Sequence, residues 1–191
     1  MRHLALDVIQ DEHRALSAML RSMSLLVAQA NREGHAPDFG VLRAMLFYVD
    51  EFPERLHHPK ESELLFPRLR QRCPALLATL DRLDADHARG EAAIRQLEHS
   101  LLAYEVLGAA RQAAFEQALG AYIDGYLHHM AVEEAEVLPA ARNTLTEADW
   151  AVLDGAFATN RDPLTGHDAD GVFKPLFRKI LMTAPAPVGL G

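Results

Sequence analysis

The sequence predicts an all-α protein, an up-down four-helix bundle followed by a C-terminal helical extension that packs on it. Three observations lead to this prediction. In four long segments apolar residues recur at steps of three and four, the spacing of amphipathic helices. Short connections join these segments, which favours antiparallel neighbours. No segment alternates apolar and polar residues with a period of two, so strands are not expected.

The first helix is predicted to end before Gly34, because glycine commonly follows the last turn of a helix. Its apolar stripe is Leu6, Ile9, His13, Leu16, Leu20, Met23 and Val27. The second helix is expected over about residues 38–72. Pro53 and Pro59 lie inside it, and because proline has no backbone N–H, we expect both to kink the helix and shift its phase.

The third helix is predicted to begin at Pro74, since proline suits a first helical turn, and to end near Gly108. Its stripe is Leu76, Leu80, Leu83, His87, Ile94, Leu97 and Leu101. The fourth helix is expected to reach about Asn143. Its stripe is Phe115, Leu119, Tyr122, Tyr126, His129 and Glu133.

The remainder of the chain has a different composition. Thr146 with Asp149 has the spacing of a helix cap, turn residues fill 160–171, and a short helix is expected over 172–182. We therefore predict a bundle over residues 1–144, and an extension of the same domain over 145–191 that contains short helices and an extended tail.

Composition excludes several classes of function. The net charge of −8 disfavours nucleic acid, because an acidic surface repels phosphate. Cys73 is the only cysteine, which excludes an internal disulfide and a thiolate metal site. No apolar stretch approaches the length of a membrane span, and no signal peptide is recognised. A cytoplasmic location is the expectation.

The two halves of the chain repeat a histidine–glutamate pattern. Segment 57–67 (HHPKESELLFP) aligns with segment 129–139 (HMAVEEAEVLP). In both, a glutamate follows the first histidine by four residues, and a proline follows that glutamate by six. Upstream lies a single histidine, His13 in the first half and His87 in the second, 44 and 42 residues before the segment's first histidine.

This pattern predicts a site for two metal ions. Residues four apart on a helix share a face, so each histidine–glutamate pair can reach one point. Imidazole and carboxylate ligands without thiolates suit iron, manganese or zinc, and two converging carboxylates can bridge two cations. The predicted bridges are Glu61 and Glu133, with His13 and His57 on one metal and His87 and His129 on the other.

Glu91 is a seventh candidate ligand, because it follows His87 by four residues on the same helix. Its counterpart in the first half is Ser17, so one metal would gain a ligand and the other would keep an open position. A surface or supporting role for Glu91 is the alternative. Gly90, where the stripe calls for a core side chain, is expected to make room for the cluster.

Three further residues lie near the candidate ligands. His58 and His128 adjoin them in sequence but lie about 100° round the helix, given 3.6 residues per turn, so they are expected to face solvent or to support the ligands. Tyr126 shares the face of His129, and either core packing or a place at the metal pocket is open to it.

The combined pattern of lone histidines, HHPKE with LLFP and HMAVEE with VLP resembles the hemerythrin-like HHE cation-binding family over about residues 4–143. The resemblance implies an up-down four-helix bundle with a non-haem di-iron centre. Two carboxylates and an oxo or hydroxo group would bridge the irons, with the six histidines and glutamates named above as ligands. The extension lies outside the common domain and is similar to one found in some bacterial members.

The resemblance implies a protein that senses, binds or handles oxygen, nitric oxide or peroxide. Oxygen carriers of this family have a fifth histidine where this chain has Glu91, which puts reversible oxygen carriage in doubt. A di-iron enzyme that decomposes peroxide or oxidises a small substrate is the alternative. A ferritin-like carboxylate site fits less well, because Glu54-x-x-His57 is the only match to its motif. A purely structural metal and a homodimer also stay open.

Overall fold

The computed structural model describes residues 2–190, and within them it contains helices and no strand, so the predicted all-α class is confirmed. The first long helix is α1 (Leu4–Glu33). It ends at Gly34, whose φ of 73° is a left-handed conformation that glycine adopts without steric cost. The second helical rod spans residues 39–72. Its parts are α2 (Phe39–Val49), η1 (Asp50–His57), α3 (His58–Lys60), η2 (Glu61–Leu65) and α4 (Phe66–Arg72).

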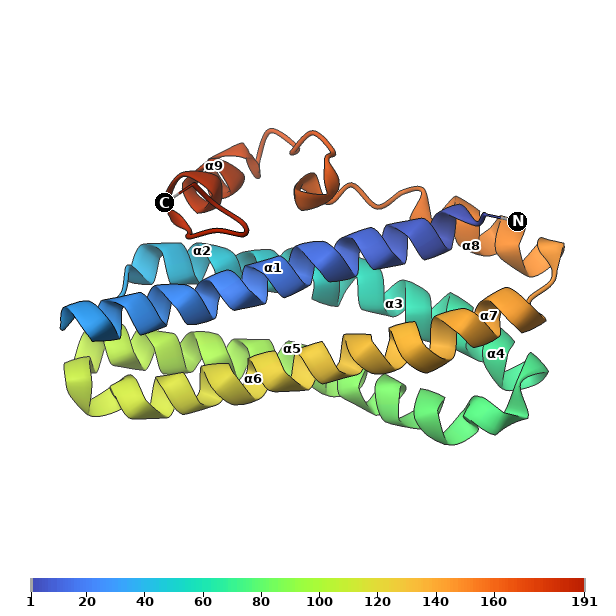
Figure 1. Ribbon diagram of the computed structural model, residues 1–191, viewed down its shortest axis with the longest axis horizontal. Helices are drawn as coiled ribbons and strands as arrows, with labels where there is room; N and C mark the ends of the chain where they lie inside the picture. The colour runs from blue at the N-terminus through green and yellow to red at the C-terminus, as the bar shows by residue number, and fades with distance from the viewer. Residues whose placement is uncertain (1, 191) are drawn as a thin grey trace.

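Two further rods complete the bundle. The third follows η3 (Pro74–Leu76) and consists of α5 (Leu77–Leu107). After η4 (Gly108–Arg111), the fourth is built from α6 (Gln112–Val132), η5 (Glu133–Val137) and α7 (Leu138–Thr144). The four rods lie lengthwise beside one another, and the chain reverses direction at each connection (Figure 1). Within residues 2–190, no helix is both long and apolar enough to cross a membrane.

The C-terminal extension packs on the bundle, as predicted. Its helices are α8 (Glu147–Phe157), η6 (Pro163–Thr165) and α9 (Lys174–Thr183). The expected cap is present, because Thr146 Oγ1 accepts from the Asp149 backbone N–H at 3.3 Å and Asp149 Oδ2 accepts from the Thr146 N–H at 2.9 Å. α8 contacts α1 beside the N-terminal end of that helix, and α9 lies over α2 (Figure 1).

Three parts of the bundle, η1, η2 and η5, are wound as π-helix, in which the N–H of residue i+5 donates to the carbonyl of residue i. The repeated prolines explain two of them. The N–H of the residue before Pro67 donates to the Glu61 carbonyl, and the N–H of the residue before Pro139 donates to the Glu133 carbonyl. Each proline lacks an N–H for a regular α-turn. The phase shift expected at Pro53 likewise takes the form of a π turn, η1.

The apolar core is divided into two clusters with a polar layer between them. One cluster lies toward α8 and the other toward α9. In α1, Ile9 belongs to the first cluster and Leu16 to the second, with His13 between them. Each of the four rods contributes side chains to both clusters. The candidate ligands therefore lie at the level of the bundle where apolar packing is interrupted.

Candidate metal centre

The first half of the centre comes from α1 and η1. His13 Nε2 lies 3.3 Å from Glu133 Oε2, and His57 Nε2 lies 3.2 Å from Glu61 Oε2. The two imidazole rings are 5.3 Å apart between centroids. Glu61 is 0% exposed and Glu133 1% exposed, so all four side chains meet inside the bundle. These four residues are brought together as the sequence predicts.

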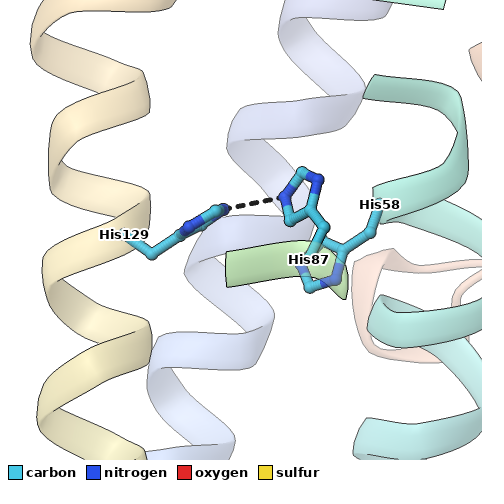
Figure 2. Close-up of side chains that lie close together, drawn as sticks. All are labelled: His58, His87 and His129. Atoms are coloured by element: carbon cyan, nitrogen blue, oxygen red, sulfur yellow. Dashed lines mark hydrogen bonds between the residues drawn. The ribbon is translucent and has the colours of Figure 1, made fainter. Parts of the chain in front are cut away.

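The second half comes from α5 and α6. His87 and His129 face each other with their Nε2 atoms 2.9 Å apart (Figure 2). His129 Nε2 lies 3.2 Å from Glu133 Oε1, and His87 Nε2 lies 3.6 Å from Glu61 Oε2. Glu61 and Glu133 thus each approach histidines from both halves, which is the placement that a bridging carboxylate needs.

The inward-facing polar atoms of the cluster are unsatisfied. Among the described residues, neither carboxylate oxygen of Glu61 or of Glu133 has a hydrogen-bond partner, and the same holds for Nε2 of His13 and of His57. Burying a carboxylate without a partner costs several kcal/mol. Metal cations at this point would satisfy all these atoms at once, so the side chains present fit a metal pair.

Three groups of ligand atoms lie within 4.8 Å of one another: His58, His87 and His129 form one, and the other two each include a predicted bridging carboxylate. Of these two, one comprises Glu61, His87, His129 and Glu133, and the other comprises His13, His57 and Glu61. Glu61 belongs to both groups. The six symmetric residues of the sequence prediction therefore form one continuous cluster.

The metal-free cluster holds its histidines in different protonation states. Burial disfavours a charged imidazole at His13, but the nearby carboxylates of Glu133 and Glu134 outweigh burial and raise its pKa to about 9. Burial also disfavours the charged form of His87, and no carboxylate contact offsets it, so the pKa of His87 falls to about 2. His87 is therefore neutral and ready to bind a metal, whereas His13 must first lose a proton.

A family model for the hemerythrin HHE cation binding domain matches residues 4–141. The chain belongs to this family. No curated protein and no solved structure shows a significant match to the chain. The hemerythrin HHE domain binds cations, and the buried histidine–glutamate cluster is the place in this chain with the ligands to hold them.

In the first half of the hemerythrin site, both outer ring nitrogens are held by carboxylates. His57 Nδ1 donates to Glu12 Oε2 at 2.7 Å, and His13 Nδ1 donates to Glu134 Oε1 at 3.1 Å. Such contacts fix the tautomer and the orientation of a metal-binding imidazole and make it more basic. Sequence reasoning missed both partners, although each glutamate is the sequence neighbour of a ligand.

In the second half, the outer ring nitrogens of the histidines have fewer hydrogen-bond partners. His87 Nδ1 is hydrogen-bonded to Ser62 Oγ at 2.8 Å. His129 Nδ1 lies 3.6 Å from Asp86 Oδ2 and has no hydrogen-bond partner among the described residues. The two halves therefore share their ligand types and differ in what surrounds them.

The prediction that Glu91 is a ligand finds no support in the geometry, and its alternative as a surface residue fits better. The Glu91 side chain is 58% exposed and pairs with Arg95 one turn further along α5. On α5, His87 contacts His129, Gly90 faces Glu54 and Ile94 is buried, so these steps of three and four mark the inward face and Glu91 lies to one side of it. The structure therefore leaves Glu91 outside the cluster.

His58 is the opposite case, because it was expected to face solvent or support the ligands and it is buried. The π turn η1 changes the helical phase just before this point, and both His57 and His58 are buried. The His58 ring stacks on that of His87, with centroids 4.1 Å apart and planes 15° apart (Figure 2). His128 is exposed.

His58 lies near His87 and His129, but its geometry suits support better than ligation. Its Nδ1 is hydrogen-bonded to Glu54 Oε2 at 3.1 Å and its Nε2 to the Tyr126 hydroxyl at 3.2 Å. Both nitrogens of His58 are thus already engaged in hydrogen bonds, although its ring lies close enough to His87 and His129 to share an ion with them. The His58 ring supports one face of His87.

Glu54 is a further residue whose role at the site sequence reasoning missed. Its carboxylate accepts hydrogen bonds from the hydroxyls of Tyr126 at 2.7 Å and Tyr122 at 3.3 Å. A Cβ added at Gly90 would collide with this carboxylate. Gly90 was expected to make room for the cluster, and the group it makes room for is Glu54. The spacing Glu54-x-x-x-His58, one helical turn, was the available signal.

Two of the cavities that border the cluster differ in the half of the site that they reach. A small one of about 20 Å³ lies beside His13, His57 and Glu133, between apolar side chains that include Leu16 and Met130. A larger one of about 430 Å³ is lined by residues of α5 and α6 and by His58 and Glu54. It reaches His87 and His129, so the second half of the site is the more accessible one.

Proposed function

We propose that this chain is a non-haem di-iron protein that binds or handles oxygen, nitric oxide or peroxide. The observation that carries the proposal is the pair of buried carboxylates, Glu61 and Glu133, whose four oxygen atoms lack partners while histidines approach them from both halves. When bound there, iron would supply redox chemistry and a position for a small ligand.

On the side of His13 and His57, the protein's own residues restrict which ligand can approach. The cavity of about 20 Å³ has room for roughly one water-sized molecule, since a water needs at least about 10–15 Å³ of such space. Its walls at Leu16, Phe52 and Met130 are apolar. A diatomic molecule or a peroxide fits this space, and an organic substrate does not.

Metal analysis of purified protein tests the proposal. Protein produced with ample iron should contain close to two iron ions per chain and absorb in the near ultraviolet as isolated in air. A single metal at full occupancy would contradict the di-iron assignment. Manganese or zinc in place of iron would keep the site and change its chemistry.

A second candidate function is peroxide decomposition with turnover. The cavity of about 430 Å³ favours it, because substrate and product can exchange at His87 and His129 through an opening between α5 and α6. A steady-state assay with hydrogen peroxide separates the candidates. A sensor changes stoichiometrically and then stops, whereas an enzyme continues.

The route through the larger cavity can be tested at Gly125, which lines it and has open space where a Cβ would be. Gly125→Leu should slow peroxide turnover while the iron content stays at its original level. Gly120→Leu is the matched control, because Gly120 lies on the same helix with equally open space and does not line the cavity.

A further inference from the structure

We propose that the C-terminal extension sets the metal affinity of the His13–His57 half by positioning His57 through Glu12, and that Asn160 is the residue that does so. This inference rests on the proposed metal pair. It assigns a role to a segment that lies beyond residues 4–141, where the family match ends.

A continuous set of hydrogen bonds connects the extension to the ligand. His57 Nδ1 donates to Glu12 Oε2 at 2.7 Å. Asn160 Nδ2 in turn donates to both oxygens of the Glu12 carboxylate, at 2.9 Å and 3.0 Å. Lys60 Nζ donates to Asn160 Oδ1 and so orients the amide. Asn160 is 4% exposed, which makes this a buried and oriented contact.

The chemistry of a metal-binding imidazole gives this contact its consequence. With Glu12 accepting from Nδ1, the proton of neutral His57 stays on Nδ1, and the Nε2 lone pair points toward Glu61 and the metal position. The Glu12 side chain is 12% exposed. Among residues 145–190, Asn160 alone holds both oxygens of Glu12, so without it Glu12 can rotate toward water.

The extension also forms one wall of the first half. Phe157 lies edge-on to the His57 ring, with centroids 6.0 Å apart. Asn160, Arg161 and Asp162 line the small cavity together with bundle residues such as Tyr126 and Met130. The second half borders the larger cavity, whose lining includes no residue of the extension. The extension thus acts on one metal position and not on the other.

The extension is anchored independently elsewhere, which supplies a matched control. Ser22 Oγ donates to the Pro185 carbonyl at 2.9 Å, between α1 and the tail. Like Asn160, Ser22 is buried, and its side chain joins the bundle to the extension. It belongs to the α9 side of the molecule and takes no part in the contacts to Glu12. Ser22→Ala therefore loosens the extension without touching the positioning contact.

The experiment is a titration of the metal-free full-length protein with cobalt(II) against a competing chelator, followed by the visible spectrum of the bound ion. Wild type should bind two equivalents. Asn160→Ala should bind one equivalent as wild type does and the other about 10-fold more weakly, within the 10–100-fold range for loss of a supporting residue. The visible bands of the more weakly bound cobalt ion should be the same bands that His57→Ala removes. Glu12→Gln should weaken the same position.

Two equivalents in wild type with unchanged binding in Asn160→Ala would overturn this proposal and leave the metal pair intact. Equal weakening of both positions, or the same selective loss in Ser22→Ala, would also overturn it, because the effect would then be general loosening. Fewer than two equivalents in wild type would contradict the proposed function as well, so the two failures are distinguishable.

Discussion

The two halves of the metal cluster present the same residue types in different surroundings. In the first half, carboxylates hold both outer histidine nitrogens and the extension covers the site. In the second half, His129 Nδ1 has no partner among the described residues and a cavity reaches the ligands. An internal repeat therefore specifies which side chains meet, whereas residues outside the repeat determine how firmly each half is held and which one is accessible.

The largest effect should come from a residue that both halves share. Glu133→Ala removes a carboxylate that approaches His13 on one side and His129 on the other. Metal affinity should fall by more than the roughly 10–100-fold expected for a supporting residue. Iron content and the melting temperature with and without a chelator measure this. A variant that keeps full metal and an unchanged spectrum would show that Glu133 is no bridge.

A pH titration should separate the halves next. In the metal-free protein the pKa of His13 is about 9 and that of His57 is raised well above its usual value, while the pKa of His87 is about 2. In the second half only His129 has a raised pKa. Metal must displace these protons, so affinity should rise with pH toward about 9, and more steeply at the first position.

The same pKa values predict an opposite trend for metal-free stability. The raised pKa of His13 contributes stability that is fully present below its unfolded value of about 6.5 and is lost as pH rises through about 9. The gap in melting temperature between metal-loaded and metal-free protein should therefore widen from pH 6.5 to pH 9. A gap that is constant over this range would contradict the protonation states described above.

Gly90→Ala should disturb the second half alone. The new Cβ would collide with the Glu54 carboxylate, which holds His58 and Tyr126 beside His87. This clash should offset the gain of about 1 kcal/mol that Ala brings to a helix interior. Gly120→Ala, with open space around its Cβ, should show that gain in chemical denaturation. Equal stabilisation of both variants would mean that Glu54 moves aside freely.

The smallest effect is expected at Glu91. Because its side chain is exposed and pairs with Arg95 on the same helix, Glu91→Ala should cost at most about 0.5 kcal/mol and leave the metal content unchanged. Loss of one metal ion in this variant would restore Glu91 as a ligand. It would also give the second half an additional anionic group that the first half lacks.

The sequence predicted the bundle and the meeting of six side chains because both follow from regular helical spacing. Four stripes define the rods, and the repeat places His13, His57, His87 and His129 with two glutamates on inward faces. Each of these inferences needs only residues that lie on one helix or in matching positions of the two halves.

The features that the sequence did not predict depend on a local change of helical phase or on contacts between residues far apart in the sequence. The burial of His58 follows from a π turn, which changes the phase of the helix by an amount that the apolar pattern alone does not give. Asn160 reaches Glu12 across 148 positions of sequence, and no periodicity connects the two. Glu91 was predicted from spacing alone, although Gly90 already occupied the inward position on α5.

The division of the apolar core has a consequence for how the molecule opens. Both clusters draw on all four rods, so each can stay packed while the other comes apart. The three π turns lie near the junction between them, and helices commonly kink at such turns. Without metal we expect backbone amides to exchange with solvent in two groups, one toward α8 and one toward α9, each with its own protection. Ions bound at the junction would tie the four rods together there and merge the two groups into one cooperative unit.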